Sequence, residues 1–284
     1  MSRRLANLFH GRPHLQVGAL LAGPIGWLVI GYLGSLLVLL IAAFWTVDPL
    51  SGEVIRGLSF ENIETLVNEP VYRTIIGRTV LIAALVTVTD AVLAFPIAFY
   101  MAKVASRRGK AVLVVAVLLP LWSSYLVKVY SWRTMLGAGG VINWALAPLG
   151  LHGPGFGNTA VWLVMSYLWL PYMILPIYAG LERIPGSLIS ASEDLGASPF
   201  TTFRRVILPL AFPAVVAGSI FTFALTLGDY ITPRLVSNNQ FIGNVIFNNI
   251  SNNLPFASAL ALVPIVVMVA YLLVARRLGA FEHI

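Results

Sequence analysis

The sequence predicts an all-α membrane protein with six transmembrane helices. Of its 284 residues, 58% are hydrophobic and 10% are charged, whereas soluble chains carry about a quarter charged residues and roughly half apolar ones. Residues 13–47, 134–181 and 235–275 contain no charged side chain at all. A soluble domain could not hold runs of this length without exposing large apolar patches, so soluble enzymes are excluded.

A hydrocarbon core near 30 Å needs about 20 apolar residues in a helix. Six stretches meet this requirement: 19–46, 79–102, 111–131, 159–180, 207–229 and 255–275. The first follows Arg3, Arg4 and Arg12, but its apolar run is longer than the roughly 7 to 15 residues of a signal peptide, so we expect a retained anchor. Residues 1–284 are therefore predicted to form a single transmembrane domain with a cytoplasmic loop over 181–206.

Basic residues predict the orientation, because cytoplasmic loops carry an excess of Lys and Arg. With a cytoplasmic N-terminus, the short loop 103–110 lies inside and carries four of the 18 basic residues. Six of the 18 then lie outside: Arg56, Arg73, Arg78, Lys128, Arg133 and Arg234. Both termini are thus predicted to be cytoplasmic in the inner or plasma membrane of a prokaryote. The net charge of +7 reflects this topology and the attraction of anionic lipids, and not a nucleic-acid partner.

Several catalytic motifs are missing from the sequence. The absence of Cys excludes a thiolate metal site and a cysteine nucleophile. Gly109-Lys110 is followed by Ala111, and Val104 stands where a nucleotide-binding P-loop needs its first glycine. The four histidines lack the spacing of metal ligands. We therefore expect no catalytic residue, metal or cofactor in this chain, and no nucleotide-binding P-loop of its own.

The predicted cytoplasmic loop has the pattern of a helix, a glycine elbow and a second helix. Ser187 is a candidate N-cap, and Leu188, Ala191 and Leu195 recur at helical spacing on one apolar stripe. Gly196 then supplies the left-handed residue that ends such a helix. Ser198 and Pro199 offer an N-cap and a first-turn proline for the second helix. That helix continues into the fifth span, so a displacement of the loop would move the span.

The spacing of Ala191, Gly196 and, nine residues later, the segment 206–209 resembles the EAA motif in membrane subunits of binding-protein-dependent ABC importers. The family pattern is Glu-Ala-Ala, three residues, Gly, nine residues, then Ile-x-Leu-Pro. This sequence has Ser190 and Ser192 in place of the usual Glu and the second Ala. A mere connector on the membrane surface is the alternative interpretation of the loop.

The resemblance implies that this loop holds a coupling helix lying in a groove on an ATPase subunit. A helix-in-groove contact suits the apolar stripe flanked by polar residues, and Glu193 and Asp194 still supply acid on the same helix. The residues expected to couple to the ATPase are Leu188, Ser190, Ala191, Ser192, Glu193, Asp194, Leu195, Gly196, Leu208 and Pro209.

Two further segments, 118–144 and 227–236, resemble spermidine/putrescine-type permeases, and the six-span layout resembles this family over essentially the whole chain. The resemblance implies a type I ABC importer permease fold. It also implies four partners: a second permease subunit, two ATPase subunits that use ATP and Mg²⁺, and a substrate-binding protein on the outer face. The implied solute is a polyamine. Another small solute remains open, as do an ion-coupled secondary transporter and a scaffold that transports nothing.

Asp90 lies midway along the second span, where a charged group costs at least about 2.5 to 3.5 kcal/mol. It either lines the translocation path and attracts a cation, or is a structural acid that is protonated or bonded to the hydroxyls of Thr87 and Thr89. The other candidates for the substrate path are aromatic or lie near the end of the fifth span: Trp122, Tyr125, Tyr167, Trp169, Asp229 and Tyr230. Aromatic rings attract ammonium groups, but core packing and an interfacial aromatic belt remain alternatives.

Overall fold

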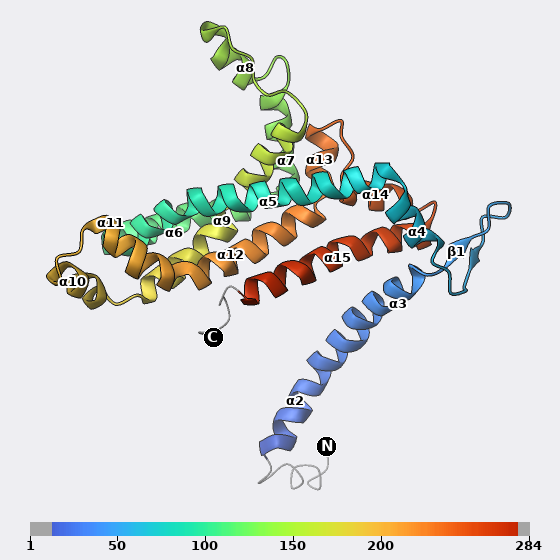
Figure 1. Ribbon diagram of the computed structural model, residues 1–284, viewed down its shortest axis with the longest axis horizontal. Helices are drawn as coiled ribbons and strands as arrows, with labels where there is room; N and C mark the ends of the chain where they lie inside the picture. Colours follow the sequence, from blue (N-terminus) through green and yellow to red (C-terminus); the bar gives the residue numbers. More distant parts are fainter. Residues whose placement is uncertain (1–12, 278–284) are drawn as a thin grey trace. The chain divides into compact units, whose positions relative to one another are not determined.

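The computed structural model describes residues 13–277 (Figure 1). Arg3, Arg4 and Arg12 and both chain ends, on which part of the predicted orientation depends, lie outside the described residues. The chain falls into two compact units, which are taken separately below. The first comprises the described part of residues 1–65 together with 249–262, and the second comprises residues 66–248 with the described part of 263–284.

The first unit begins with a long helical stretch that ends at a small hairpin. Its elements are α2 (Pro13–Trp27), the π-helical segment η1 (Leu28–Leu33), α3 (Gly34–Ala42), and the strands β1 (Thr46–Val47) and β2 (Val54–Ile55). The strands pair antiparallel with Thr46 opposite Ile55. At the hairpin turn, Asp48 accepts hydrogen bonds from the backbone N–H groups of Leu50 and Ser51, which hold the pKa of its carboxyl below the usual range.

Helices make up most of the second unit. In chain order the remaining elements are α4 (Glu61–Asn68), α5 (Pro70–Phe99), η2 (Tyr100–Val104), α6 (Arg107–Trp122), α7 (Tyr125–Leu136), α8 (Val141–Leu146), η3 (Ala147–Leu149), α9 (Asn158–Arg183), α10 (Gly186–Asp194), α11 (Pro199–Thr202), η4 (Phe203–Ile207), α12 (Leu208–Gly228), α13 (Ile231–Val236), α14 (Ile242–Asn249) and α15 (Leu254–Arg277). Three of these helices, α4, α14 and α15, straddle boundaries between the units.

The predicted spans match helices of sufficient length and apolarity. Within residues 13–277, five such helices are present, and a bent pair makes a sixth. The single helices cover Leu20–Ala42, Pro70–Val104, Asn158–Arg183, Pro199–Gly228 and Leu254–Arg277. The second is the longest at 35 residues, or roughly 50 Å at 1.5 Å per residue, so it extends beyond a 30 Å hydrocarbon core. The prediction of six membrane-spanning stretches in an all-α fold is confirmed.

The third predicted span, 111–131, is not one helix. It is divided between α6 and α7, and the segments Arg107–Trp122 and Tyr125–Leu149 are bent by 88° relative to each other. Ser123 and Ser124 between them have extended backbone angles, and Pro120 in the last turn of α6 cannot donate a backbone hydrogen bond. The carbonyl of Pro120, at the end of the helix, accepts from the Ser123 hydroxyl at 2.8 Å and from the Lys128 ammonium at 2.9 Å. Side chains on both sides of the break therefore satisfy this carbonyl.

The second unit is built on α5, α9 and α12, which pack along one another (Figure 1). Small residues allow close approach where α9 meets α12: a Cβ added to Gly218 would lie 2.7 Å from the Met173 sulfur. One buried cluster lies around Val164, Leu168 and Val86, and another lies around Ile177, Ala98 and Ile207. We call the end of this unit that carries α10 and α11 the loop end, and the end that carries α13 and α14 the far end (Figure 1).

Candidate functional site

The predicted helix–glycine–helix loop is present at the loop end. Helix α10 ends at Asp194, and Gly196 follows with φ of 76°, the left-handed conformation expected for it. The Gly196 N–H donates to the Glu193 carbonyl at 2.8 Å, and the Ala197 N–H donates to the Ser192 carbonyl at 3.1 Å. These two bonds form a Schellman motif, which satisfies carbonyls that the helix end leaves free.

The two helix starts were predicted with different success. Ser198 caps α11 as expected: its hydroxyl accepts from the Thr201 N–H, and Pro199 occupies the first helical position. The prediction of Ser187 as an N-cap is wrong. Helix α10 already begins at Gly186, and its N-cap residue is Pro185, whose side chain offers no hydrogen-bond acceptor.

The apolar stripe predicted on α10 faces solvent. Leu188, Ala191 and Leu195 are all exposed, and 89% of the Leu195 surface is accessible. Phe200 on α11 is also exposed, at 70%, although its place in the sequence gave no signal of this. We name Leu188, Ala191 and Leu195 the apolar stripe. Exposed apolar side chains gathered on one short element are typical of a docking surface.

The serine that replaces the second alanine of the motif makes a contact that alanine could not make. The hydroxyls of Ser192 and Thr202 are 2.9 Å apart and share a hydrogen bond between α10 and α11. Thr202 is buried, whereas Ser190, Glu193 and Asp194 are exposed. The elbow is therefore closed by one side-chain bond, and the acidic residues remain accessible beside the apolar stripe.

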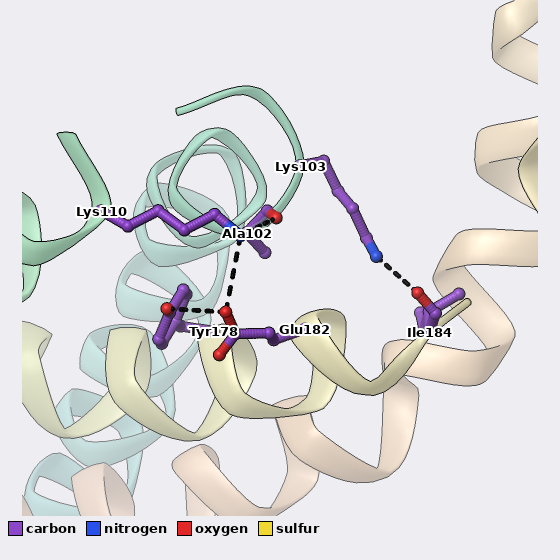
Figure 2. Close-up of polar contacts among 6 residues, drawn as sticks. All are labelled: Ala102, Lys103, Lys110, Tyr178, Glu182 and Ile184. Atoms are coloured by element: carbon purple, nitrogen blue, oxygen red, sulfur yellow. Dashed lines mark hydrogen bonds and ion pairs between the residues drawn. The ribbon is translucent and has the colours of Figure 1, made fainter. Parts of the chain in front are cut away.

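Lysine side chains hold the start of the loop against the end of α5, as Figure 2 shows. The Lys103 ammonium donates to the carbonyl of Ile184, the residue that follows α9, at 2.6 Å. The Lys110 ammonium donates to the Ala102 carbonyl at 2.8 Å and lies 3.5 Å from a carboxylate oxygen of Glu182. The Tyr178 hydroxyl donates to the same oxygen at 3.1 Å.

An apolar groove of about 550 Å³ lies beside the loop. Its walls come from the last turns of α9 and the first half of α12, and Leu188 of the apolar stripe closes one side. Pro209 and Pro213 contribute to the α12 wall, and Arg183 is the charged residue among the lining side chains. The motif residues Leu208 and Pro209 are both exposed at the start of α12.

A second cavity, of about 400 Å³, lies between α7, α9 and the C-terminal end of α12. Four residues that the sequence suggested for a substrate path line it together: Tyr125, Trp169, Asp229 and Tyr230. The remaining lining residues are Ala224, Leu225 and Gly228. Asp229 is the charged residue in this lining, so the cavity combines one carboxylate with three aromatic rings. We name it the aromatic cavity.

Hydrogen bonds fix the Asp229 carboxylate. One oxygen accepts from the backbone N–H groups of Ile231 and Thr232 at 2.9 and 3.2 Å, at the start of α13. The other oxygen accepts from the hydroxyls of Tyr125 and Thr232, both at 2.6 Å. All of these donors are neutral. Thr232 was missed from sequence because it lies 107 positions from Tyr125.

The aromatic side chains are held by contacts with one another. Tyr125 and Trp169 are stacked with ring centroids 6.0 Å apart, and Trp169 meets Tyr172 edge to face at 5.9 Å. On the other side of the cavity, Tyr230 stacks on Phe247 at 4.6 Å. Such pairs stabilise ring positions by about 0.5–1.5 kcal/mol beyond area burial. The rings are therefore fixed before any ligand arrives.

Three other candidates lie outside the aromatic cavity. Trp122 is the last residue of α6, and its side chain is 89% exposed. The break before Tyr125 places these two residues on differently directed helices. Tyr167 packs against Trp132 with a centroid distance of 5.5 Å. Of the two aromatic candidates in the third predicted span, only Tyr125 therefore lines the aromatic cavity.

Asp90 is fully buried, and its carboxylate has no hydrogen-bond partner among the described residues. The two threonines expected to satisfy it are engaged elsewhere. The Thr87 hydroxyl donates to the Ala83 carbonyl, and the Thr89 hydroxyl accepts from the Trp162 indole N–H. The interpretation of Asp90 as an acid bonded to Thr87 and Thr89 is therefore wrong, and its place on a substrate path stays a prediction.

Comparison with known proteins gives one family over most of the chain. The family described as "Binding-protein-dependent transport system inner membrane component" matches residues 73–281. The inner membrane ABC transporter permease protein YdcU of Escherichia coli K12 is 45% identical over 98% of this chain and 95% of its own length. The spermidine/putrescine permease PotB of Haemophilus influenzae is 31% identical over 88% of this chain and 90% of its own length.

Solved structures with the same fold are also permeases of ABC importers. A bacterial ABC transporter that imports the acidic polysaccharide alginate has a chain that superimposes with a TM-score of 0.73 at 18% identity, covering 97% of this chain and 98% of that one. An inward-facing methionine transporter, MetNI, gives a TM-score of 0.56 over 78% of this chain and 97% of that one, at 17% identity. At these identities the likeness concerns the fold.

Proposed function

We propose that this chain, which belongs to the family of binding-protein-dependent transport system inner membrane components, conducts polyamines across the membrane. Its role as the permease subunit of an ABC importer follows from the family match and from relatives that share nearly its whole length. A secondary transporter or an inert scaffold would not belong to this family. The proposal therefore concerns the solute, the site that receives it and the partner subunits.

The aromatic cavity is the observation that carries the choice of solute. Asp229 presents one negative charge, and the rings of Tyr125, Trp169 and Tyr230 surround the same space. An ammonium group over an aromatic face gains about 0.5–2 kcal/mol, more where water is excluded. A fixed carboxylate beside such faces suits the ends of putrescine and spermidine, whereas it would repel an anionic solute. The spermidine/putrescine permease named above supports the same solute class.

The aromatic cavity suits weak and transient binding. Asp229 already accepts four hydrogen bonds, so few of its lone pairs remain for a ligand. It therefore attracts an ammonium group mainly through its charge. A transport site must release its solute, and a charge held by neutral donors provides attraction without a dedicated ion pair. We expect the binding protein to capture the polyamine and the cavity to bind it more weakly during its passage.

The partners follow from the same proposal. A second permease subunit completes the pathway and covers the apolar groove beside the loop. Two ATPase subunits, which bind ATP and Mg²⁺, receive the apolar stripe of this chain and of the second permease. The substrate-binding protein docks on the far end, and both termini are cytoplasmic. This orientation agrees with the four basic residues of loop 103–110.

Transport then depends on two states of the bundle. Closure of the ATPases displaces α10, and the continuous helix from Pro199 to Gly228 carries this displacement to the residue before Asp229. ATP drives the change only because it binds one state more tightly than the other. The aromatic cavity is thereby opened to one side of the membrane at a time.

The test is uptake by the complete importer in proteoliposomes. The permease pair, the ATPases and the binding protein are reconstituted, and labelled putrescine, spermidine, an amino acid and a sugar are compared with ATP inside or absent. We expect ATP-dependent uptake of the polyamines alone. Uptake of another solute with indifference to polyamines would overturn the choice of solute, and uptake independent of ATP would overturn the role of the ATPases.

A further inference from the structure

We propose that Lys103 is a positioning residue for energy coupling, because its ammonium ties the entry of the coupling loop to η2, which continues α5 at the end of the second span. This inference rests on the proposed function, in which displacement of α10 drives transport. The sequence and the motif indicate one route by which a displacement of the loop reaches a membrane span, through α11 and η4 into α12. The contacts at the loop end add a second route for this displacement, through Lys103 into the second span.

The bonded atom lies at the point where the loop begins. Ile184 is the residue that follows α9, and Pro185 after it is the N-cap residue of α10. The carbonyls in the last turn of a helix lack intrahelical partners, and a lysine there satisfies one of them and complements the helix dipole. Lys103 does so from a different helix, at 2.6 Å, across 81 positions of sequence. The bond therefore joins η2 to the residue that follows α9, where the loop begins.

A second contact holds the exit of the loop to the same helix. The ring of Phe203, in η4, meets the ring of Phe95, in α5, edge to face at 5.5 Å. Between these two anchors, the apolar stripe is exposed and free to be displaced by a partner. The loop is thus fixed to α5 at both ends and accessible in the middle.

The neighbouring lysine strengthens the entry anchor without touching the loop. Lys110 donates to the carbonyl of Ala102, next to Lys103, and lies beside Glu182 near the end of α9 (Figure 2). Its ion pair is partly exposed, so it contributes little by itself. The contact from Lys103 reaches the residue that precedes α10, so Lys103 is the side chain that moves with the loop.

Substitution of Lys103 tests the second route. Lys103→Met keeps an unbranched side chain and removes the ammonium, and Lys103→Arg keeps a cationic donor. Arg108→Met removes an exposed basic residue from the first turn of α6 as a control. Uptake and ATP hydrolysis are measured together in the reconstituted importer. For Lys103→Met we expect hydrolysis within twofold of wild type and solute moved per ATP lowered about tenfold. Lys103→Arg should recover at least half of the coupling, and Arg108→Met should match wild type.

A label experiment keeps the inference testable if Lys103→Met does not assemble. The chain contains no native cysteine, so nitroxide labels can be placed at Val104→Cys, which is exposed, and at Gly186→Cys, where an added Cβ meets no atom within 4 Å. In the otherwise wild-type importer, we expect the distance between the labels to remain constant when ATP closes the ATPases.

Two results would overturn the inference. One is normal coupling in Lys103→Met, and the other is a label distance that changes with ATP. If the wild-type importer itself shows no ATP-dependent uptake, the proposed function fails, and the label distance still decides whether the loop entry and α5 move together.

Discussion

At the loop end, polar side chains bond to backbone carbonyls, whereas at the far end hydroxyls converge on one carboxylate. Lys103 and Lys110 hold the ends of helices in place, and the apolar residues of the loop are left exposed. Tyr125 and Thr232 instead hold Asp229, and the apolar residues there are rings that face a cavity. The first arrangement suits a surface that a protein partner moves, and the second suits a site that attracts a small cation.

This difference predicts that substitutions at the two ends affect different quantities. Changes at the loop end should lower the amount of solute moved per ATP and leave solute preference unchanged. Changes in the aromatic cavity should alter the solute concentration required and leave the basal rate of ATP hydrolysis unchanged.

The largest effect is expected from Gly196→Val. A β-branched residue at φ of 76° is strained, and the left-handed conformation alone costs about 1–2 kcal/mol for residues other than glycine. The elbow should open, and uptake by the reconstituted importer should fall more than tenfold while the subunit still inserts. Gly196→Asn is the matched control, because asparagine tolerates this conformation. Equal uptake by the valine and asparagine variants would contradict a role for the elbow geometry.

Asp229→Asn should have the next largest effect. Asparagine keeps one oxygen for the N–H groups of Ile231 and Thr232 but removes the charge. We expect the half-saturating concentration for polyamine uptake to rise about tenfold, equivalent to about 1.4 kcal/mol, with basal hydrolysis unchanged. Initial rates over a range of putrescine concentrations measure this. An unchanged concentration dependence would remove Asp229 from the site.

Tyr125→Phe should produce a smaller change at the same place. The ring that stacks on Trp169 is retained, and the hydroxyl that bonds to Asp229 is lost. A single hydrogen bond contributes about 1 kcal/mol, so we expect a threefold to fivefold rise in the half-saturating concentration. The double variant with Asp229→Asn tests the link. If the two effects simply add, Tyr125 does not act through the carboxylate.

Ser192→Ala should have the smallest effect. It restores the residue usual in the motif and removes the hydrogen bond to Thr202, worth about 0.5–1.5 kcal/mol. We expect coupling to fall by no more than threefold, without a change in solute preference. Uptake per ATP hydrolysed measures this, and Ser190→Ala serves as the control on the exposed face. A loss as large as that of Gly196→Val would mean that the hydroxyl bond, and not the glycine, sets the elbow.

The loop was predictable from sequence because its signals are local. Gly196, Ser198 and Pro199 each act on the backbone within a few residues, so their spacing defines the elbow without any tertiary contact. The exposure of the Phe200 side chain was not predicted, because it depends on the tertiary position of α11 and not on local sequence. Ser187 failed as an N-cap because Pro185, two residues earlier, is the N-cap residue and the helix already begins at Gly186.

The aromatic cavity was predictable only in its residue types. Asp229 and the aromatic residues stood out as unusual in spans, yet their grouping depends on contacts across 104 positions of sequence. The break between Trp122 and Tyr125 also decided which aromatic residue enters the cavity, and hydropathy alone does not detect a break of 88°. Long-range packing therefore separated Tyr125 and Trp169 from Trp122 and Tyr167.

The most direct test of the account is calorimetric titration of the binding protein that copurifies with this subunit. Putrescine and spermidine are titrated first, followed by anions, sugars and amino acids. The account predicts tight binding of polyamines and no detectable binding of the others. Tight binding of a neutral or anionic solute, with none for polyamines, would contradict the assignment of the aromatic cavity to an ammonium group.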